Sequence, residues 1–298
     1  MSELALIKQI RETTGCGIAD CSKALKENGG DIEKSIDWLR KKGLSSAAKK
    51  TGRVTSEGVI ATTIQDNKAS LIEVNSETDF VAKNDKFQEF VSKLADESIT
   101  YGDDIAKFQS DNDGKIKEMI GVIGENITIR RLSSLSVNSG TIVSYLHNKI
   151  SDNMGKLGVL IALESDIAKD KLEDLGKQIA MHIAATKPEA LSIESVSPER
   201  LSRETDVLKE QARASGKPEN IIEKMIQGRI NKFYEEIVLL EQNFVMNDKI
   251  KIKDLIADFA KENNGQLAIS NFKILVLGEG VEKKENDFAA EVASMTSK

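Results

Sequence analysis

The stretch GVIATTIQDNKASLIEVNSETDFVAKND, residues 58–85, carries the clearest structural signals in the chain. Two runs of mainly β-branched and aliphatic residues flank Asp66 and Asn67, and this pattern predicts a β-hairpin. The second run ends at Val74, after which the sequence becomes polar and acidic. Phe80 follows at the tip of this acidic turn, although aromatic residues make up only 4% of the chain. The position of Phe80 is therefore the first question that the sequence raises.

Two interpretations of Phe80 are open at this point. In the first, Thr78 or Asp79 caps a short helix, and Phe80 packs beneath that helix against Phe87 or Val91. In the second, Phe80 is exposed on a capped turn, where a rigid aromatic side chain can anchor a partner protein. The local pattern alone favours the buried position.

Residues 1–53 predict a bundle of three short helices. Apolar residues recur at helical spacing in 3–13, in 18–27 and after Asp31, which is a good N-cap residue. Gly43 is expected to end the third helix. The residues predicted to face inward are Leu4, Ile7, Ile10, Cys21, Ala24, Leu25, Ile32, Ile36 and Leu39.

Residues 57–139 and 140–278 predict two related α/β sandwich units. Each has the order strand, strand, helix, strand, which makes the expected fold class α+β. An insertion near 197–243 has the apolar spacing of an antiparallel helical hairpin with a turn at 216–218. Ser197 and Pro198 are expected to open its first helix as the N-cap and first-turn residues. This hairpin is either a protruding arm or an ordinary packed helix pair, and the pattern does not distinguish them.

Composition limits the classes of function. The formal net charge is −6, which argues against a general nucleic-acid binder because phosphate neutralisation requires clustered Lys and Arg. Residues 1–53 contain 11 Lys and Arg and 7 Asp and Glu, a charge of +4 that leaves −10 for the remainder. The charged N-terminal stretch has no long apolar run, so we expect no signal peptide and no membrane contact. Cys16 and Cys21 do not form a disulfide framework, and a reducing cytoplasm is the expected compartment.

Sequence signatures of catalysis are scarce. The two histidines, His147 and His182, are too few for a His-based metal site, and no phosphate-binding or nucleophile motif has the required spacing. We therefore expect no metal, no cofactor and no covalent chemistry. His182 lies at the edge of the apolar stripe predicted for the helix at 169–185, where a hydrogen-bonded boundary histidine is the common outcome.

Segments along the whole chain resemble the bacterial translation elongation factor Ts family. They are IRETTGCGIADCSKALKENGGDIEKSIDWLRKKG, EVNSETDFVAKNDKFQEF, GENITIRR, IAMHIAATKPEAL, QGRINKFYEE and GEGVEKKENDFAAEVASM. The resemblance implies a guanine-nucleotide exchange factor that binds elongation factor Tu with GDP and promotes GDP release. It also implies a bundle similar to ubiquitin-associated domains at 1–53 and a C-terminal helical module at 279–298.

The resemblance further implies the residues that bind the partner. The Asp-Phe pair of the family falls on Asp79 and Phe80, which is expected to wedge between two helices of elongation factor Tu. Thr78 and Val81 flank this pair and are assigned to the same contact. His182, with its neighbour Met181, matches a partner-contacting position of the family. The sequence leaves open whether the complex is 1:1 or 2:2.

Two rival functions are also open. An adaptor would use an apolar patch of the bundle near residues 15–18. An RNA-binding protein would use the basic segment 40–53, although no aromatic stacking platform accompanies it. Neither rival gives Phe80 a role.

Overall fold

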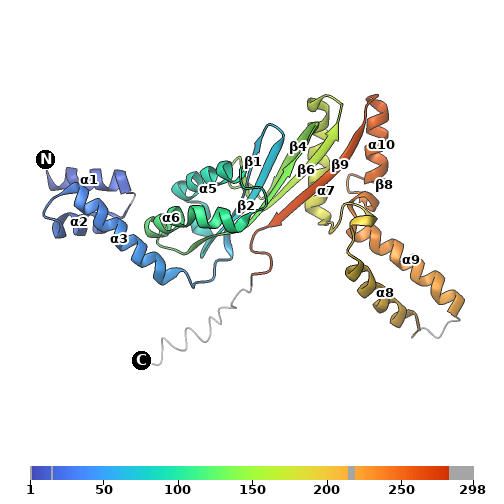
Figure 1. Cartoon of the computed structure of the whole chain (residues 1–298), viewed down its shortest axis with the longest axis horizontal. Coiled ribbons are helices and arrows are strands. Elements are labelled where there is room, and N and C mark those ends of the chain that lie inside the picture. Colours follow the sequence, from blue (N-terminus) through green and yellow to red (C-terminus); the bar gives the residue numbers. More distant parts are fainter. Residues whose placement is uncertain (1, 15, 214–218, 282–298) are drawn as a thin grey trace.

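The structure is a computed structural model that describes residues 2–14, 16–213 and 219–281. The described chain mixes helices with antiparallel sheets, and the predicted α+β class is confirmed. Figure 1 shows an elongated molecule with a helical bundle at one end and a helical arm at the other.

The element bounds follow the chain order. The helices are α1 (Glu3–Thr14), α2 (Ile18–Glu27), α3 (Ile32–Lys50), α4 (Asp79–Ala82), α5 (Asp85–Ser98), α6 (Ile105–Ile123), α7 (Lys169–Thr186), α8 (Pro198–Arg213), α9 (Glu219–Ile237) and α10 (Ile252–Glu262), with short 3-10 turns η1 (Ile193–Ser195) and η2 (Leu239–Glu241). The strands are β1 (Glu57–Gln65), β2 (Lys68–Ser76), β3 (Ile127–Ser136), β4 (Gly140–His147), β5 (Met154–Gly155), β6 (Leu157–Ser165), β7 (Asn243–Phe244), β8 (Asn247–Lys251) and β9 (Leu267–Val276).

The N-terminal bundle of α1, α2 and α3 matches the prediction in most of its core. Its buried apolar residues are Ile7, Ile10, Cys21, Ala24, Leu25 and Leu39, and Ile32 and Ile36 pack against them in half-buried positions. The prediction for Leu4 was wrong: α1 enters the bundle core one turn later, at Ile7 and Ile10, and Leu4 is 79% exposed.

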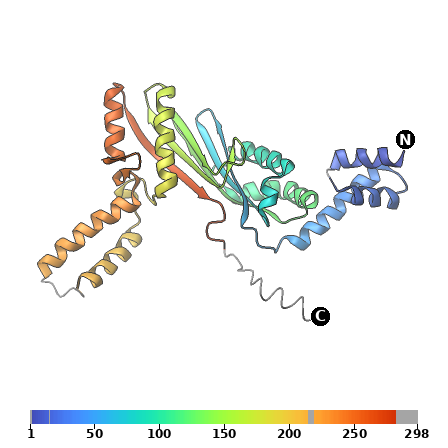
Figure 2. The same cartoon turned by 180° about the vertical axis from the view of Figure 1, so that it is seen from behind.

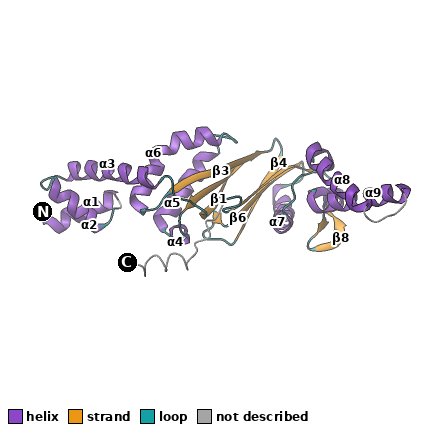
Figure 3. Ribbon diagram, turned by 90° about the horizontal axis from the view of Figure 1, so that it is seen from below, coloured by secondary structure: helices purple, strands orange, loops and turns teal. Residues whose placement is uncertain are grey.

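Gly43 does not end α3, which continues to Lys50. An ideal Cβ at Gly121 of α6 would lie 3.1 Å from the Cα of Gly43. Gly43 therefore permits close approach of two helices instead of terminating one. Figure 3 shows α3 running beside α6, so this contact joins the bundle to the rest of the chain.

The central part of the molecule consists of four layers. One sheet has the order β3-β2-β1-β5 and the other the order β4-β6-β9. The two sheets face each other across a shared apolar core that includes Ile60, Leu71 and Leu160. Helices α4, α5 and α6 cover the outer face of the first sheet, and α7 and α10 cover the outer face of the second. This arrangement confirms the predicted α/β sandwich; the domain boundaries themselves stay a prediction.

The two sheets are built from structural repeats. We call β1, β2, α4 to α6 and β3 the first repeat, and β4, β6, α7, α10 and β9 the second repeat. In both, the second strand pairs with the third through a register shift, at Glu73/Val74 and at Ala162/Leu163. In both, a glycine of the first strand has a positive φ and faces the carbonyl beside that shift, Gly58 against Val74 and Gly140 against Leu163. A Cβ there would lie 2.2 Å and 2.1 Å from the carbonyl oxygen, so both positions require glycine.

The inserted helical hairpin is a protruding arm. Figures 1 and 2 show α8 and α9 extending away from the sheets, with only their base near the core. The Ser197 hydroxyl accepts a hydrogen bond from the Arg200 amide at 3.2 Å, which confirms Ser197 as the N-cap of α8. The predicted turn at 216–218 and most of the predicted C-terminal module at 279–298 lie outside the described residues.

Candidate functional site

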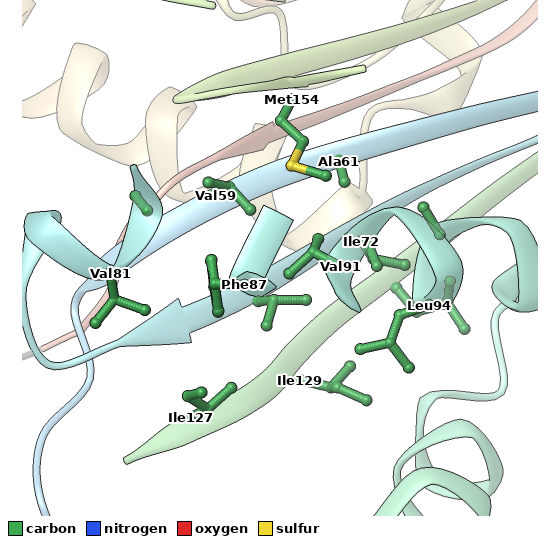
Figure 4. Packing of buried hydrophobic residues seen from close by; sticks show 14 of the residues in the cluster. Val59, Ala61, Ile72, Val81, Phe87, Val91, Leu94, Ile127, Ile129 and Met154 are labelled. Atoms are coloured by element: carbon green, nitrogen blue, oxygen red, sulfur yellow. The ribbon is translucent and has the colours of Figure 1, made fainter. Parts of the chain in front are cut away.

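The candidate site is the corner that follows β2, residues 77–82, which we call the Phe80 corner. Thr78 has extended backbone angles and is the N-cap of α4, a helix of a single turn. Val81 and Ala82 of this turn are 5% and 3% exposed and belong to the core beneath α5. Figure 4 shows Val81 among the buried side chains near Phe87 and Ile127. Since adjacent helical residues point roughly 100° apart, burial of Val81 directs Phe80 away from the core.

The Phe80 side chain is 76% exposed. The interpretation of an exposed aromatic residue is confirmed, and the buried alternative against Phe87 or Val91 is wrong. The other exposed large apolar side chains among the described residues are aliphatic or methionine. An exposed ring on a backbone that is fixed by its buried neighbours has the geometry of an interface anchor.

Charged groups flank the ring. The Asp79 carboxylate forms an ion pair of 3.4 Å with Lys83, one turn later. The Lys83 ammonium lies 6.0 Å from the centroid of the Phe80 ring, at the outer limit of a cation–π contact. Both charged groups are accessible, so a partner that covers the ring also meets one anion and one cation.

The other two residues predicted at this corner have internal roles. Val81 is buried, so the prediction that it contacts a partner directly does not fit its position; it anchors the corner instead. Thr78 is half-buried, and its hydroxyl donates to the Glu125 carboxylate at 2.7 Å.

His182 is not at the boundary that the sequence predicted. The ring is fully buried, with Nε2 2.9 Å from Oε1 of Gln242. The Val245 amide donates to Nδ1 at 3.3 Å, so the ring proton resides on Nε2 and points at Gln242. Burial lowers the pKa of His182 below its usual value, and the hydrogen bond to Gln242 opposes this only in part.

A fully enclosed ring cannot make the direct partner contact that the family resemblance implied for His182. The segment that follows α9 covers α7 at this point. It contacts His182 through Gln242, which is 60 residues later in the sequence. His182 therefore holds the segment at 242–245 against α7. Its neighbour Met181 is half-buried on the same helix.

One buried carboxylate was not expected. Glu73 on β2 is fully buried and ion-paired with Arg130 at 3.0 Å and with Arg131. The Gly278 amide also donates to it at 2.8 Å, so the Glu73 carboxylate fixes the chain beyond β9 to the first sheet. Because its partners are cations and donors, it is a structural anion and not one of a catalytic carboxylate pair.

Sequence reasoning missed two residues that hold the Phe80 corner. The Glu77 carboxylate accepts a hydrogen bond from the backbone N–H of Asn126 at 2.6 Å, and the Glu125 carboxylate accepts one from the backbone N–H of Thr78 at 2.9 Å. These contacts cross between segments 47 to 49 residues apart. No local pattern signals them; only the acidic position inside the GENITIRR segment could have drawn attention.

Comparison with known proteins gives a consistent result. A family model described as Elongation factor TS matches residues 77–279, which include the Phe80 corner and the second repeat. The chain belongs to the elongation factor Ts family. It is 50% identical to an Elongation factor Ts of Rhodospirillum centenum, covering 98% of this chain and 97% of that protein. The proteins of the same name from Gluconobacter oxydans and Rhizobium leguminosarum bv. trifolii are 49% and 48% identical, with at least 96% of each chain covered.

Membership of this family identifies the chain as a translation elongation factor, used in protein biosynthesis. Within residues 2–14, 16–213 and 219–281, no helix has the length and apolarity needed to cross a bilayer. The same residues bring together no group of three or more His, Cys, Asp or Glu side chains suited to a metal ion.

Proposed function

We propose that this chain is a guanine-nucleotide exchange factor for elongation factor Tu and acts in the cytoplasm during translation elongation. It binds the GDP-loaded partner, promotes the release of GDP and magnesium, and so permits reloading with GTP. The observation that carries the proposal is the Phe80 ring, 76% exposed on a corner whose neighbours are buried. Family membership supports elongation factor Tu as the partner that such an anchor meets.

The mechanism follows from linkage and needs no covalent step. A nucleotide held at nanomolar affinity is bound by about 12 kcal/mol, so its unassisted release is slow. A factor that binds the empty partner more tightly than the loaded one weakens nucleotide binding by the same ratio. Chemistry at the factor is unnecessary, and we expect neither a cofactor nor direct contact with nucleic acid or membrane.

Each residue of the corner has a distinct part in this proposal. Phe80 enters between two helices of the nucleotide domain as an apolar wedge. Asp79 fixes the turn through Lys83 and bonds to partner groups once the ring is inserted. The displaced helices then withdraw ligands from the magnesium shell and the phosphates. Whether the complex is 1:1 or 2:2 does not change this step.

The test is stopped-flow release of labelled GDP from purified elongation factor Tu. Substoichiometric amounts of this chain are expected to accelerate release, which separates an exchange catalyst from a simple binder. Phe80→Ala is expected to slow the accelerated release by well over tenfold, because a buried aromatic anchor typically contributes about 2 kcal/mol or more. Ile64→Ala, which trims another exposed apolar residue of the same repeat, serves as the control and is expected to match wild type. Unchanged GDP release with Phe80→Ala would refute the proposal.

An adaptor function of the bundle is the second candidate. Ile18 is 57% exposed beside the half-buried Cys16, as a patch near residues 15–18 requires. This function predicts that the isolated patch, and not Phe80, dominates binding. Retained partner binding with Ile18→Ser, together with loss in Phe80→Ala, would exclude it.

The RNA-binding alternative finds little support in the basic segment 40–53. Arg40 pairs with Glu118 at 3.0 Å, Lys42 with Asp20 at 2.6 Å and Arg53 with Glu77 at 3.3 Å. Pairing of these three cations within the chain reduces the positive charge that the segment offers to phosphate groups.

A further inference from the structure

The two repeats provide an internal comparison for the Phe80 corner. Strand pairing places Ser76 opposite Ile127 in the first repeat and Ser165 opposite Leu267 in the second. Counting outward from these pairs aligns Glu77 with Asp166, Asn126 with Gln266, and Glu125 with Gly265.

One hydrogen bond is common to both repeats. The Glu77 carboxylate accepts a hydrogen bond from the backbone N–H of Asn126 at 2.6 Å, and the Asp166 carboxylate accepts one from the backbone N–H of Gln266 at 2.6 Å. Each bond ties the end of the second strand to the start of the third. Because it also occurs in the repeat that exposes no aromatic ring, this bond serves the fold.

A second tie exists only in the first repeat. The two oxygens of Glu125 accept from the Thr78 amide at 2.9 Å and from the Thr78 hydroxyl at 2.7 Å. The equivalent Gly265 has no side chain, and the Ile167 amide, which corresponds to that of Thr78, bonds locally to the Ser165 hydroxyl at 3.0 Å. The Glu125 contact is therefore an addition specific to the corner that carries Phe80.

The corner has a physical need for such a tie. Helix α4 is one turn long, and its N-cap residue Thr78 makes no side-chain capping bond to it. A short helix whose first amides lack intrahelical partners deforms easily when its exposed residue is pushed. Charge-assisted bonds to a carboxylate are the strong kind, and two of them hold the residue two positions before the ring.

We propose that Glu125 is a positioning residue for nucleotide exchange, which holds the Phe80 corner rigid while the ring enters the partner. The inference rests on the proposed exchange function. Without the two hydrogen bonds between Glu125 and Thr78, the Phe80 corner deforms when the ring is inserted. Part of the binding free energy is then used to deform this chain instead of displacing the helices of elongation factor Tu. Loss of Glu125 then lowers the rate of exchange more than it weakens the encounter.

The experiment compares Glu125→Ala, Glu125→Gln and Phe80→Ala in the labelled-GDP assay over a range of factor concentrations. Glu125→Ala is expected to lower the maximal release rate about tenfold, with a change of less than about threefold in the half-saturating concentration. Glu125→Gln retains one acceptor oxygen and is expected to fall between wild type and alanine. The matched control is Glu97→Ala, because Glu97 pairs at the surface with Lys115 at 2.6 Å and is expected to leave exchange unchanged.

Amide hydrogen exchange of the free full-length chain gives a readout that does not involve the partner. The Thr78 amide is expected to exchange faster in Glu125→Ala, whereas the buried core of α5 keeps its protection. If Phe80→Ala leaves GDP release unchanged, the exchange function itself fails. If Phe80→Ala slows release but Glu125→Ala and Glu125→Gln both retain the wild-type rate, only the positioning role is overturned. Should Glu125→Ala fail to fold, a wild-type release rate in Glu125→Gln together with a faster-exchanging Thr78 amide also overturns the positioning role.

Discussion

The corner after β2 and the corner after β6 occupy equivalent places in the two repeats, yet they bury different residues. We call residues 166–168 the Ile167 corner. Ile167 is 9% exposed and packs into the core of the second repeat, whereas its equivalent in the first repeat, Thr78, is half-buried. Phe80 is 76% exposed and lies two positions later, where the second repeat has the exposed Lys169. The same backbone plan therefore buries an isoleucine in the second repeat where the first repeat has a half-buried threonine, and only the first repeat places an aromatic ring at the exposed position that follows. The position of Phe80 is thus exposed in both repeats, and the residue type found there distinguishes the two corners.

The residue two positions before the third strand of each repeat explains much of the difference between the two corners: it is Glu125 before β3 and Gly265 before β9. An ideal Cβ at Gly265 would lie 2.4 Å from Cγ1 of Ile167 and 2.7 Å from Oδ1 of Asp166. Only glycine leaves room there for Ile167 to turn inward. In the first repeat Glu125 occupies this position and binds Thr78, which holds the corner in another arrangement.

The largest expected effect on stability comes from truncating Ile167, and the same truncation of Phe80 serves as the comparison. Ile167→Ala should lower the free energy of unfolding by about 2–4 kcal/mol, because it leaves a cavity in a packed core. Phe80→Ala should change it by less than about 0.5 kcal/mol, because its ring already faces solvent. Urea unfolding followed by circular dichroism measures both. Equal losses in the two variants would contradict the contrast between the corners.

A smaller loss is expected where the second corner needs its glycine. Gly265→Ala should destabilise by about 1–3 kcal/mol, since the new methyl group overlaps Ile167 and must displace it. Gly228→Ala is the matched control: Gly228 lies within α9 and a Cβ there meets nothing within 4 Å. That variant should be neutral or stabilise by up to about 1 kcal/mol. Thermal unfolding of both variants checks the order, and a Gly265→Ala protein as stable as wild type would remove the steric explanation.

Sequence reasoning succeeded where structure is set by near neighbours. The β1–β2 hairpin, the strands of the second repeat and the Ser197 cap follow from alternation, turn residues and capping chemistry. It offered two positions for Phe80 and preferred the wrong one on local pattern, because the deciding fact is that Val81 fills the core beneath α5.

The failures all involve contacts between distant segments. Gly43 looked like a helix end because its partner, Gly121 on α6, is remote in sequence. His182 looked like a boundary residue because Gln242, which encloses it, comes from the end of the inserted hairpin. Periodicity reports which face of an element is apolar, but not which later segment will cover the rest.

The smallest expected effect is the dependence of stability on pH. It extends the comparison from the two corners to the segment at 242–245, which packs over His182 in the second repeat. His182 lies inside that repeat, and the groups that contact its ring are uncharged: Gln242, the Val245 amide and the Phe244 ring. Burial lowers its pKa in the folded chain, so the unfolded chain binds the proton more readily as pH falls through about 6.5. Stability from this residue is therefore complete above that pH and declines below it towards the folded-state pKa, with a slope of at most about 1.4 kcal/mol per pH unit.

Urea titrations between pH 8 and pH 5 measure this slope in wild type and in His182→Gln, which keeps hydrogen-bonding capacity without a titrating ring. The variant should show a shallower decline of unfolding free energy over that range. The Phe80 corner has no histidine contact, so the amide exchange of Thr78, corrected for its intrinsic pH dependence, should stay constant while amides of the segment at 242–245 lose protection. Equal loss of amide protection at Thr78 and at 242–245 would mean that acid destabilises the whole sandwich at once. Protonation of His182 would then not act locally on the segment that covers it.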